Sequence, residues 1–263
     1  MNHAILLISC PDRKGITAAV TNFVFRHGGN IVDADQHTDI DASVFFMRIK
    51  WELAGFGLAR EHIENAFRPV AEEFAMSWEL YFDDRLPRVA VFVSRHLHCL
   101  HDLLFRYRSG QLPCSLALVL SNHQEAEPMA RQWGVEFLHV PVMTETKADA
   151  EAQQLAALQS RGIDCIVLAR YHQILSAGFI ERYRNRIINI HHSFLPAFAG
   201  ASPYAQAHRK GVKIIGATSH YVVEALDEGP IIEQDTARVS HKHSLEEMVM
   251  LGQDLERVVL YRA

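Results

Sequence analysis

Residues 187–196 read Ile187-Ile188-Asn189-Ile190-His191-His192-Ser193-Phe194-Leu195-Pro196, a short apolar run that ends in Asn and His and enters a loop. Four similar apolar runs precede it, at residues 89–93, 115–120, 137–140 and 165–168. Segments with helical spacing separate them, at residues 97–107, 125–133 and 147–161. Short continuous apolar strands that alternate with helices are typical of a parallel sheet covered on both faces. The pattern predicts a doubly wound α/β domain with a mainly parallel sheet, extended by strands at 212–222 and 230–239 and a helix at 245–261.

The first 82 residues have a different order of predicted elements. Strands at 4–10, 30–39, 43–52 and 77–82 and helices at 16–27 and 58–74 follow one another as β-α-β-β-α-β. This order is ferredoxin-like. The polar, proline-containing segment 83–88 separates this unit from the second series of strands and helices. We therefore predict two domains, residues 1–83 and 84–263.

Composition restricts the classes of partner. The chain has 26 Lys and Arg against 31 Asp and Glu, a net charge of −5, so we expect no nucleic-acid partner. No apolar stretch approaches the ~18 residues that a membrane helix needs, so we expect no membrane partner. The four cysteines, at positions 10, 99, 114 and 165, are scattered through apolar stretches. They are typical of reduced core residues in a cytoplasmic protein.

Polar side chains that suit acyl chemistry occur where predicted strands end. Asn189 and His191 alternate along their strand and therefore lie on the same side of it. Asp227 lies in a turn, Leu226-Asp227-Glu228-Gly229-Pro230, just before another predicted strand, and His220 precedes this turn. An amide donor, an imidazole and a carboxylate can stabilise an oxyanion and move protons without a nucleophilic Ser or Cys. A turn residue plus a structural histidine is the simpler interpretation of the same pattern.

Two longer segments carry a specific resemblance. Residues 189–196, Asn-Ile-His-His-Ser-Phe-Leu-Pro, and residues 216–232, Gly-Ala-Thr-Ser-His-Tyr-Val-Val-Glu-Ala-Leu-Asp-Glu-Gly-Pro-Ile-Ile, resemble the signature of the folate-dependent formyltransferase family. Residues 98–100, 112–114 and 168–175 are similar to the branch of that family that hydrolyses 10-formyltetrahydrofolate. In the N-terminal unit, residues 11–16 and 28–31 resemble an ACT domain, an amino-acid-sensing module.

The resemblance implies a Rossmann-like catalytic domain behind an ACT domain and a role in one-carbon metabolism and purine biosynthesis. The family's catalytic residues fall on Asn189, His191 and Asp227. Its folate pocket borders the loop Arg170, Tyr171, His172, Gln173, Ile174 and Leu175, in which His172 replaces an expected Met. The implied reaction is hydrolysis of 10-formyltetrahydrofolate to tetrahydrofolate and formate, without a cofactor or metal. Family members also continue beyond the position of Ala263.

The ACT resemblance implies further partners. A four-stranded sheet leaves an exposed face or edge, so we expect a homo-oligomer assembled partly through residues 1–82. An amino-acid effector is expected near Asp12, Gly15 and Asn30, where N–H groups at a helix start can meet its carboxylate.

The residues leave open which molecule accepts the formyl group. Family members that formylate a phosphorylated amine carry a glycine-rich loop after the first catalytic strand, whereas residues 93–99 here contain no glycine. Backbone N–H groups in such a loop hold phosphate, so water is the expected acceptor here. Transfer to another amine, or a regulatory amino-acid-binding protein with a degenerate catalytic half, are the competing interpretations. His96, His98, Cys99 and His101 are weak candidates for a zinc site, since only His98 and His101 share a helical face.

Overall fold

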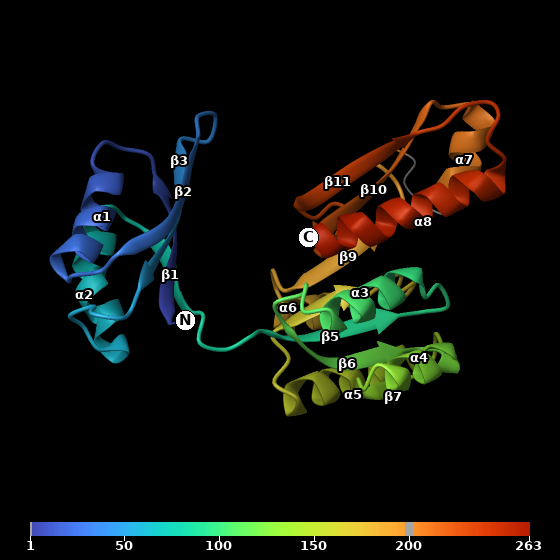
Figure 1. Ribbon diagram of the computed structural model, residues 1–263, viewed down its shortest axis with the longest axis horizontal. Coiled ribbons are helices and arrows are strands. Elements are labelled where there is room, and N and C mark those ends of the chain that lie inside the picture. Colours follow the sequence, from blue (N-terminus) through green and yellow to red (C-terminus); the bar gives the residue numbers. More distant parts are fainter. Residues whose placement is uncertain (1, 198–201) are drawn as a thin grey trace. The chain divides into compact units, whose positions relative to one another are not determined.

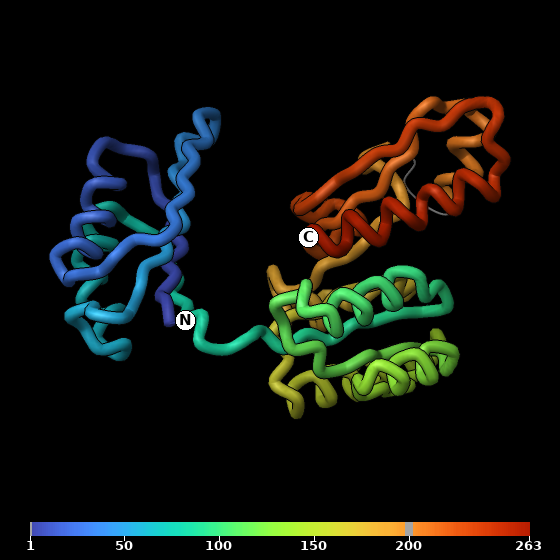
Figure 2. The backbone as a smooth tube through the Cα atoms, viewed as in Figure 1, coloured from blue at the N-terminus to red at the C-terminus, as the bar shows by residue number. Residues whose placement is uncertain are grey.

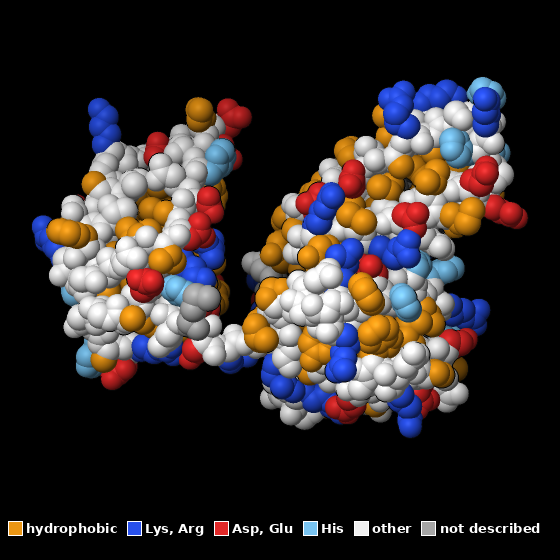
Figure 3. All heavy atoms as spheres, viewed as in Figure 1, with side chains coloured by type: hydrophobic (Ala, Val, Ile, Leu, Met, Phe, Trp, Pro, Cys, Tyr) orange, Lys and Arg blue, Asp and Glu red, His pale blue; other side chains and the backbone are white. Residues whose placement is uncertain are grey.

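A computed structural model describes residues 2–197 and 202–263. The chain divides into two compact units, Met1–Leu86 and Pro87–Ala263, and the division falls within the polar segment between them. Each unit has its own sheet and its own apolar core (Figure 1). Acidic and basic side chains both occur on the viewed face of each unit (Figure 3).

The N-terminal unit is an antiparallel sheet covered by two helices. Its elements are β1 (His3–Pro11), α1 (Ile16–Arg26), β2 (Ile31–Asp39), β3 (Val44–Glu52), α2 (Arg60–Glu73) and β4 (Ser77–Phe82). The strands pair in the order β2-β3-β1-β4, each antiparallel to its neighbours. The structure thus confirms the predicted β-α-β-β-α-β order.

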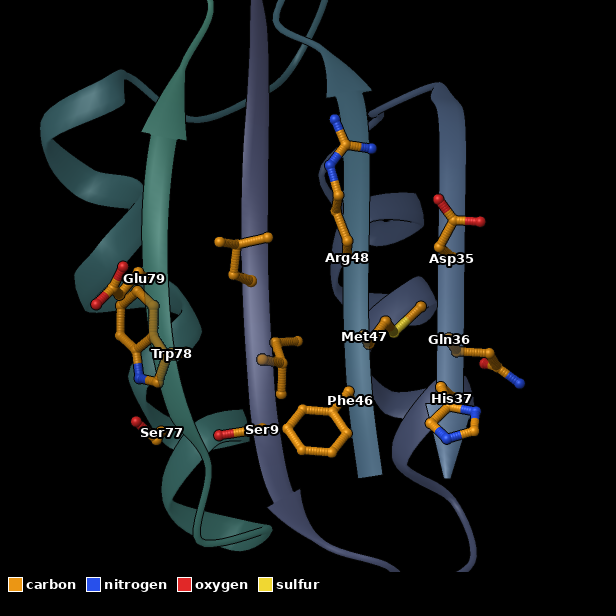
Figure 4. Close-up of a pocket in the computed structure, with 12 residues that line it drawn as sticks. Ser9, Asp35, Gln36, His37, Phe46, Met47, Arg48, Ser77, Trp78 and Glu79 are labelled. Carbon is orange, nitrogen blue, oxygen red and sulfur yellow. The ribbon is translucent and has the colours of Figure 1, made fainter. Parts of the chain in front are cut away.

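Side-chain alternation decides which face of this sheet is buried. The side chains of β3 that pack against the helices are Phe45, Met47, Ile49 and Trp51, each at most 5% exposed. Phe46 points to the opposite face and is 45% exposed. In the described part of this unit, both helices lie on one side of the sheet and leave the other side open (Figure 4).

The C-terminal unit alternates strands and helices. Its elements are β5 (Arg88–Val93), α3 (His98–Arg108), β6 (Ser115–Ser121), a 3₁₀ turn (Gln124–Ala126), α4 (Glu127–Gln132), β7 (Phe137–His139), α5 (Lys147–Ser160), β8 (Cys165–Leu168), α6 (Ala177–Arg182), β9 (Ile187–His191), α7 (Pro203–Lys210), β10 (Ile214–Tyr221), β11 (Ile231–Arg238) and α8 (Leu245–Arg262). Helices cover both faces of the sheet. α5 and α6 pack on one face, and α3, α4 and α8 pack on the other.

The strand order locates the site. The seven strands follow the order β11-β10-β9-β8-β5-β6-β7, and the five from β9 to β7 are parallel to one another. β10 and β11 are antiparallel additions, alongside which α8 runs (Figure 2). β6 lies on one side of β5 and β8 on the other, so the order reverses between β5 and β8. Ligands of such sheets bind outside the carboxyl ends of the strands at this reversal.

Two short helices were not predicted from the sequence. α6 has six residues and α7 has eight, which is too short for a helical period to stand out. The Ser176 hydroxyl accepts a hydrogen bond from the Phe179 amide and caps α6. Within the described residues, every helix falls short of the length and apolarity required to cross a bilayer.

Candidate active site

A pocket of about 380 Å³ lies at the carboxyl ends of β8 and β9, beside the reversal of strand order. The loop after β8, the end of β9, the end of β10 and the turn before β11 form its walls. The lining residues are Leu168, Arg170, Tyr171, His172, Gln173, Ile174, Leu175, Ile180, Asn189, Ile190, His191, His192, His220, Val222, Val223, Glu224, Leu226 and Asp227. The structure therefore brings the three predicted catalytic residues and the predicted folate loop into one cavity.

Asn189, His191 and Asp227 are connected through close contacts. His191 Nδ1 lies 3.4 Å from Asp227 Oδ2. Asn189 Nδ2 lies 3.2 Å from His220 Nε2, which in turn is 3.6 Å from Asp227 Oδ1. His220 thus joins the two sides of the cluster, and the four side chains share one wall of the pocket.

The carboxylate of Asp227 is ionised at neutral pH. Hydrogen bonding from His191 holds the pKa of Asp227 well below its usual range despite partial burial. Because Nδ1 of His191 faces this carboxylate, Nε2 is the ring nitrogen left for a substrate. Among the described residues, His191 Nε2 is buried and has no hydrogen-bond partner. When the ring is protonated, Nε2 can donate to an oxyanion while Nδ1 donates to Asp227.

His220 determines which way the Asn189 amide points. His220 Nδ1 lies 2.9 Å from the Tyr221 carbonyl oxygen. A carbonyl only accepts, so Nδ1 carries a proton, and in this tautomer Nε2 can accept from the Asn189 amide. Asn189 therefore presents its NH₂ group to His220 and keeps a second N–H for a ligand. Sequence reasoning placed His220 near the Asp227 turn without this role.

A tight turn holds Asp227 against the end of β10. Asp227 itself adopts φ 59°, a left-handed conformation. A Cβ at Gly229 would lie 1.7 Å from the Tyr221 carbonyl oxygen, so only glycine fits where the turn passes β10. The Tyr221 amide also donates to the Pro230 carbonyl at 2.9 Å, which fixes the turn to the strand that carries His220.

Gly229→Ala is expected to lower the free energy of unfolding by ~1–3 kcal/mol, because the turn must shift away from β10. The same shift moves Asp227 away from His191, so turnover is expected to fall as well. Gly178→Ala is the matched control, since a Cβ there meets nothing within 4 Å. Urea unfolding of both variants checks the difference, and equal stability of the two would show that the turn adapts freely.

The start of loop 170–175 is attached to the neighbouring strand β5. Arg170 adopts φ 63°, and its carbonyl accepts from the Ser94 amide at 3.2 Å. The Ser94 hydroxyl accepts from the His172 amide at 3.1 Å and donates to Asn122 at 2.7 Å. Ser94 lies in the segment without glycine that follows β5. That segment therefore supports the pocket wall.

A second cavity, of about 490 Å³, adjoins the first and shares Arg170, His172 and His192 with it. Glu256 of α8 is buried in its wall. Its carboxylate accepts from His98 Nε2 at 2.7 Å and from the Tyr204 hydroxyl at 2.9 Å, and lies 3.5 Å from Arg170 Nε. This network was not predicted from the sequence. The sequence feature that could have indicated it is a glutamate on the buried face of α8, four residues after Gly252 and three before Val259.

The histidines between the two cavities are neutral at pH 7. Burial lowers the pKa of His172 to about 4 and that of His192 to about 3, and the nearby Arg170 acts in the same direction. The His172 ring packs edge to face on His96, with ring centres 5.4 Å apart. His172 therefore offers a neutral ring to both cavities.

A metal centre is a poor fit to the buried cluster. Within the described chain, ligand atoms of His98, Cys99 and Glu256 lie within 4.8 Å of one another. Burial, reinforced by Glu256, raises the pKa of Cys99 well above its usual range and disfavours the thiolate that binds metals. The Arg170 guanidinium beside Glu256 repels a cation. The cluster is better described as a hydrogen-bonded network around one carboxylate.

The three residues predicted to bind an effector lie at two ends of the N-terminal sheet. The Asp12 amide donates to Ser43 at 2.9 Å, and Gly15 precedes α1 with φ 100°. Asn30 Nδ2 donates to Glu52 at 2.9 Å. β3 runs between Ser43 and Glu52, a separation of roughly 31 Å at ~3.4 Å per residue. Within one chain, Asn30 is therefore not brought together with Asp12 and Gly15.

Both units match known families. Residues 87–263 match the formyl transferase family, and residues 4–65 match the ACT domain. Formyltetrahydrofolate deformylase from Synechocystis sp. is 49% identical over 99% of this chain and 91% of its own length. The enzyme of that name from Bacillus subtilis is 48% identical over 98% of this chain and 86% of its own length.

Solved structures give the same relationship. The crystal structure of a formyltetrahydrofolate deformylase from Pseudomonas syringae pv. tomato has a TM-score of 0.96 and 46% identity, and covers 100% of this chain and 88% of that one. A glycinamide ribonucleotide transformylase from Symbiobacterium toebii reaches a TM-score of 0.64 and 31% identity over 70% of this chain and 88% of that one. The similarity to deformylases includes both units, and the chain belongs to the formyltetrahydrofolate deformylase family.

Proposed function

We propose that the protein hydrolyses 10-formyltetrahydrofolate to tetrahydrofolate and formate. The observation that carries this proposal is the convergence of Asn189, His191 and Asp227 in a pocket walled by loop 170–175. The names of the similar enzymes support it over formyl transfer to an amine.

Loop 170–175 would bind the pterin ring of the substrate. Leu168, Leu175 and Ile180 provide apolar surface in the pocket, while the loop backbone offers donors and acceptors to a heterocycle edge. A pterin held there would direct the formyl group on N10 toward Asn189 and His191. Arg170 and neutral His172 are the members of the loop that line both cavities.

Asn189 and His191 would stabilise the oxyanion. Water attacks the formyl carbon, the carbonyl π electrons move to oxygen, and a tetrahedral intermediate forms. The free Asn189 N–H and protonated His191 Nε2 donate to that oxygen, in a partly buried site where such bonds are strong. Both donors are already oriented, Asn189 by His220 and His191 by Asp227.

Asp227 would orient the water and move its proton. The ionised carboxylate accepts from His191 through Oδ2 and can accept from the attacking water through Oδ1. The proton lost by water passes to Asp227 and then to N10, which becomes basic as the C–N bond breaks. The products are tetrahydrofolate with N10–H and formate. The proposed reaction uses only water and these side chains, without a cofactor.

Incubation with 10-formyltetrahydrofolate alone tests the activity. We expect stoichiometric release of formate and tetrahydrofolate, measured by a formate dehydrogenase-coupled assay. Addition of glycinamide or another small amine is expected to leave the formate yield unchanged. Loss of formate in favour of an N-formyl amine would show a transferase, and no turnover at all would favour a purely regulatory protein.

We also propose that the N-terminal unit assembles copies of the chain and binds an amino-acid effector. Its open sheet face has a shallow hollow of about 500 Å³ in which Phe46, Ser9 and Arg48 lie in front of the helices (Figure 4). Leu7 and Phe46 are 38% and 45% exposed there. The face also carries Arg48 and Glu79, so the same surface on a second copy can meet it with opposite charges. The effector would bind at such an interface near Asp12 and Gly15.

Reduced, free cysteines fit a cytoplasmic location.

Phe46→Asp is expected to shift the protein toward monomers, because a charge on this face opposes its burial against a second copy. Light scattering measures the mass, and Phe25→Asp is the matched control, an exposed aromatic on α1. Activity assays with each of the twenty amino acids test the effector. A monomeric wild-type protein would contradict assembly, and indifference to every amino acid would contradict sensing.

A further inference from the structure

The buried face of α5 carries two polar side chains that point toward the wall of the pocket. Glu151 is 9% exposed and Gln154 is 1% exposed, and they lie one helical turn apart. A carboxylate and an amide on the core side of a helix cost free energy unless hydrogen bonds compensate them. Their partners therefore indicate why they are there.

Both side chains bind the segment that includes loop 170–175. Glu151 Oε1 accepts from the Ser176 amide at 2.9 Å, and Oε2 accepts from the Ser176 hydroxyl. Gln154 Nε2 donates to the Tyr171 hydroxyl at 3.0 Å. The two side chains thus attach the loop near its beginning and just after its end.

Each of the two side chains, Glu151 and Gln154, positions a residue that shapes the pocket. Tyr171 lines the pocket and packs edge to face on Phe92 with ring centres 5.2 Å apart, so Gln154 fixes the ring as well as its hydroxyl. Ser176 caps α6, whose Ile180 also lines the pocket. Neither Glu151 nor Gln154 is itself a lining residue of this pocket.

We infer that Glu151 and Gln154 are positioning residues that hold loop 170–175 in its substrate-binding conformation before the substrate arrives. The inference rests on the proposed hydrolysis of 10-formyltetrahydrofolate. The loop has no regular secondary structure of its own. Fixing it in advance removes an ordering cost from binding, so its anchors act on substrate affinity. The catalytic cluster is built on β9, β10 and the turn before β11, and does not depend on these anchors.

Steady-state kinetics of Glu151→Ala test the inference. We expect KM for 10-formyltetrahydrofolate to rise about tenfold, as for loss of a hydrogen bond to a charged group, with kcat within about threefold of wild type. Glu151→Gln is expected to restore most of the affinity, because Gln can accept from the Ser176 amide and donate to its hydroxyl. Asp149→Asn, an exposed acid on the same helix, is the matched control with unchanged KM.

Gln154→Leu provides a second, nearly isosteric variant if Glu151→Ala does not fold. It is expected to raise KM about threefold with kcat preserved, because it removes one neutral hydrogen bond. An unchanged KM in the folded variants would overturn the inference. A fall in kcat and melting temperature without a rise in KM would also overturn it, since that is the signature of a purely structural role. Failure of the wild type to release formate would instead refute the proposed function.

Discussion

Asp227→Asn is expected to lower kcat for formate release by ~10³-fold, within the range found when a proton-transfer group is removed. Asparagine keeps the shape of the side chain but cannot accept the proton of the attacking water. It also removes the negative charge that supports protonated His191 at 3.4 Å. Because both effects arise as the tetrahedral intermediate forms, KM should change by less than about threefold.

Two measurements distinguish this role from a general loss of structure. Binding of tetrahydrofolate, followed by fluorescence titration, should remain close to that of wild type in Asp227→Asn. Asp254→Asn, an exposed acid on α8 paired with Arg257, should keep full turnover. Equal losses of binding and turnover in Asp227→Asn would rule out a role confined to the chemical step.

Asn189→Ala is expected to lower kcat by ~10²-fold or more, the effect of losing one oxyanion donor. The structure sharpens this expectation. One N–H of Asn189 is already engaged by His220 at 3.2 Å, which leaves the second N–H directed away from that ring. Alanine removes the donor to the oxyanion and also leaves His220 Nε2 without its partner.

The same kinetic assay checks this variant, with kcat compared at saturating substrate. A change of less than about threefold would show that Asn189 is only a structural residue of β9 and that His191 alone meets the oxyanion. In that case His220 would have no substrate-related role through Asn189.

The positions of Asn189, His191 and Asp227 could be predicted because they follow from local rules. Alternation along a strand places Asn189 and His191 on the same side, and parallel strands end at a common edge of the sheet. The turn around Asp227 is encoded by Gly229, which has no room for a side chain. These features depend on short stretches of sequence whose geometry is nearly independent of the rest of the chain.

The expected effector site shows the limit of such rules. Asp12, Gly15 and Asn30 are each in a turn or loop of the kind that was predicted, yet antiparallel pairing of β1 with β3 separates Asn30 from the other two. Asp12 and Gly15 precede α1 and Asn30 follows it, so the length of this helix keeps Asn30 away from the other two.

The sequence by itself determined the two domain types and the order of most strands and helices, because periodicity is a local property, and the resemblance to the formyltransferase family indicated the proposed trio of Asn189, His191 and Asp227. Only the tertiary structure decided how those groups are held. Ser94 follows β5, Glu151 and Gln154 lie on α5, and Glu256 lies on α8. The first three reach the pocket wall through hydrogen bonds, and Glu256 reaches it through its 3.5 Å contact with Arg170. The physical reason is that a buried polar group must be hydrogen-bonded. Which residue becomes its partner is decided by how distant segments pack together, and no local sequence pattern indicates it.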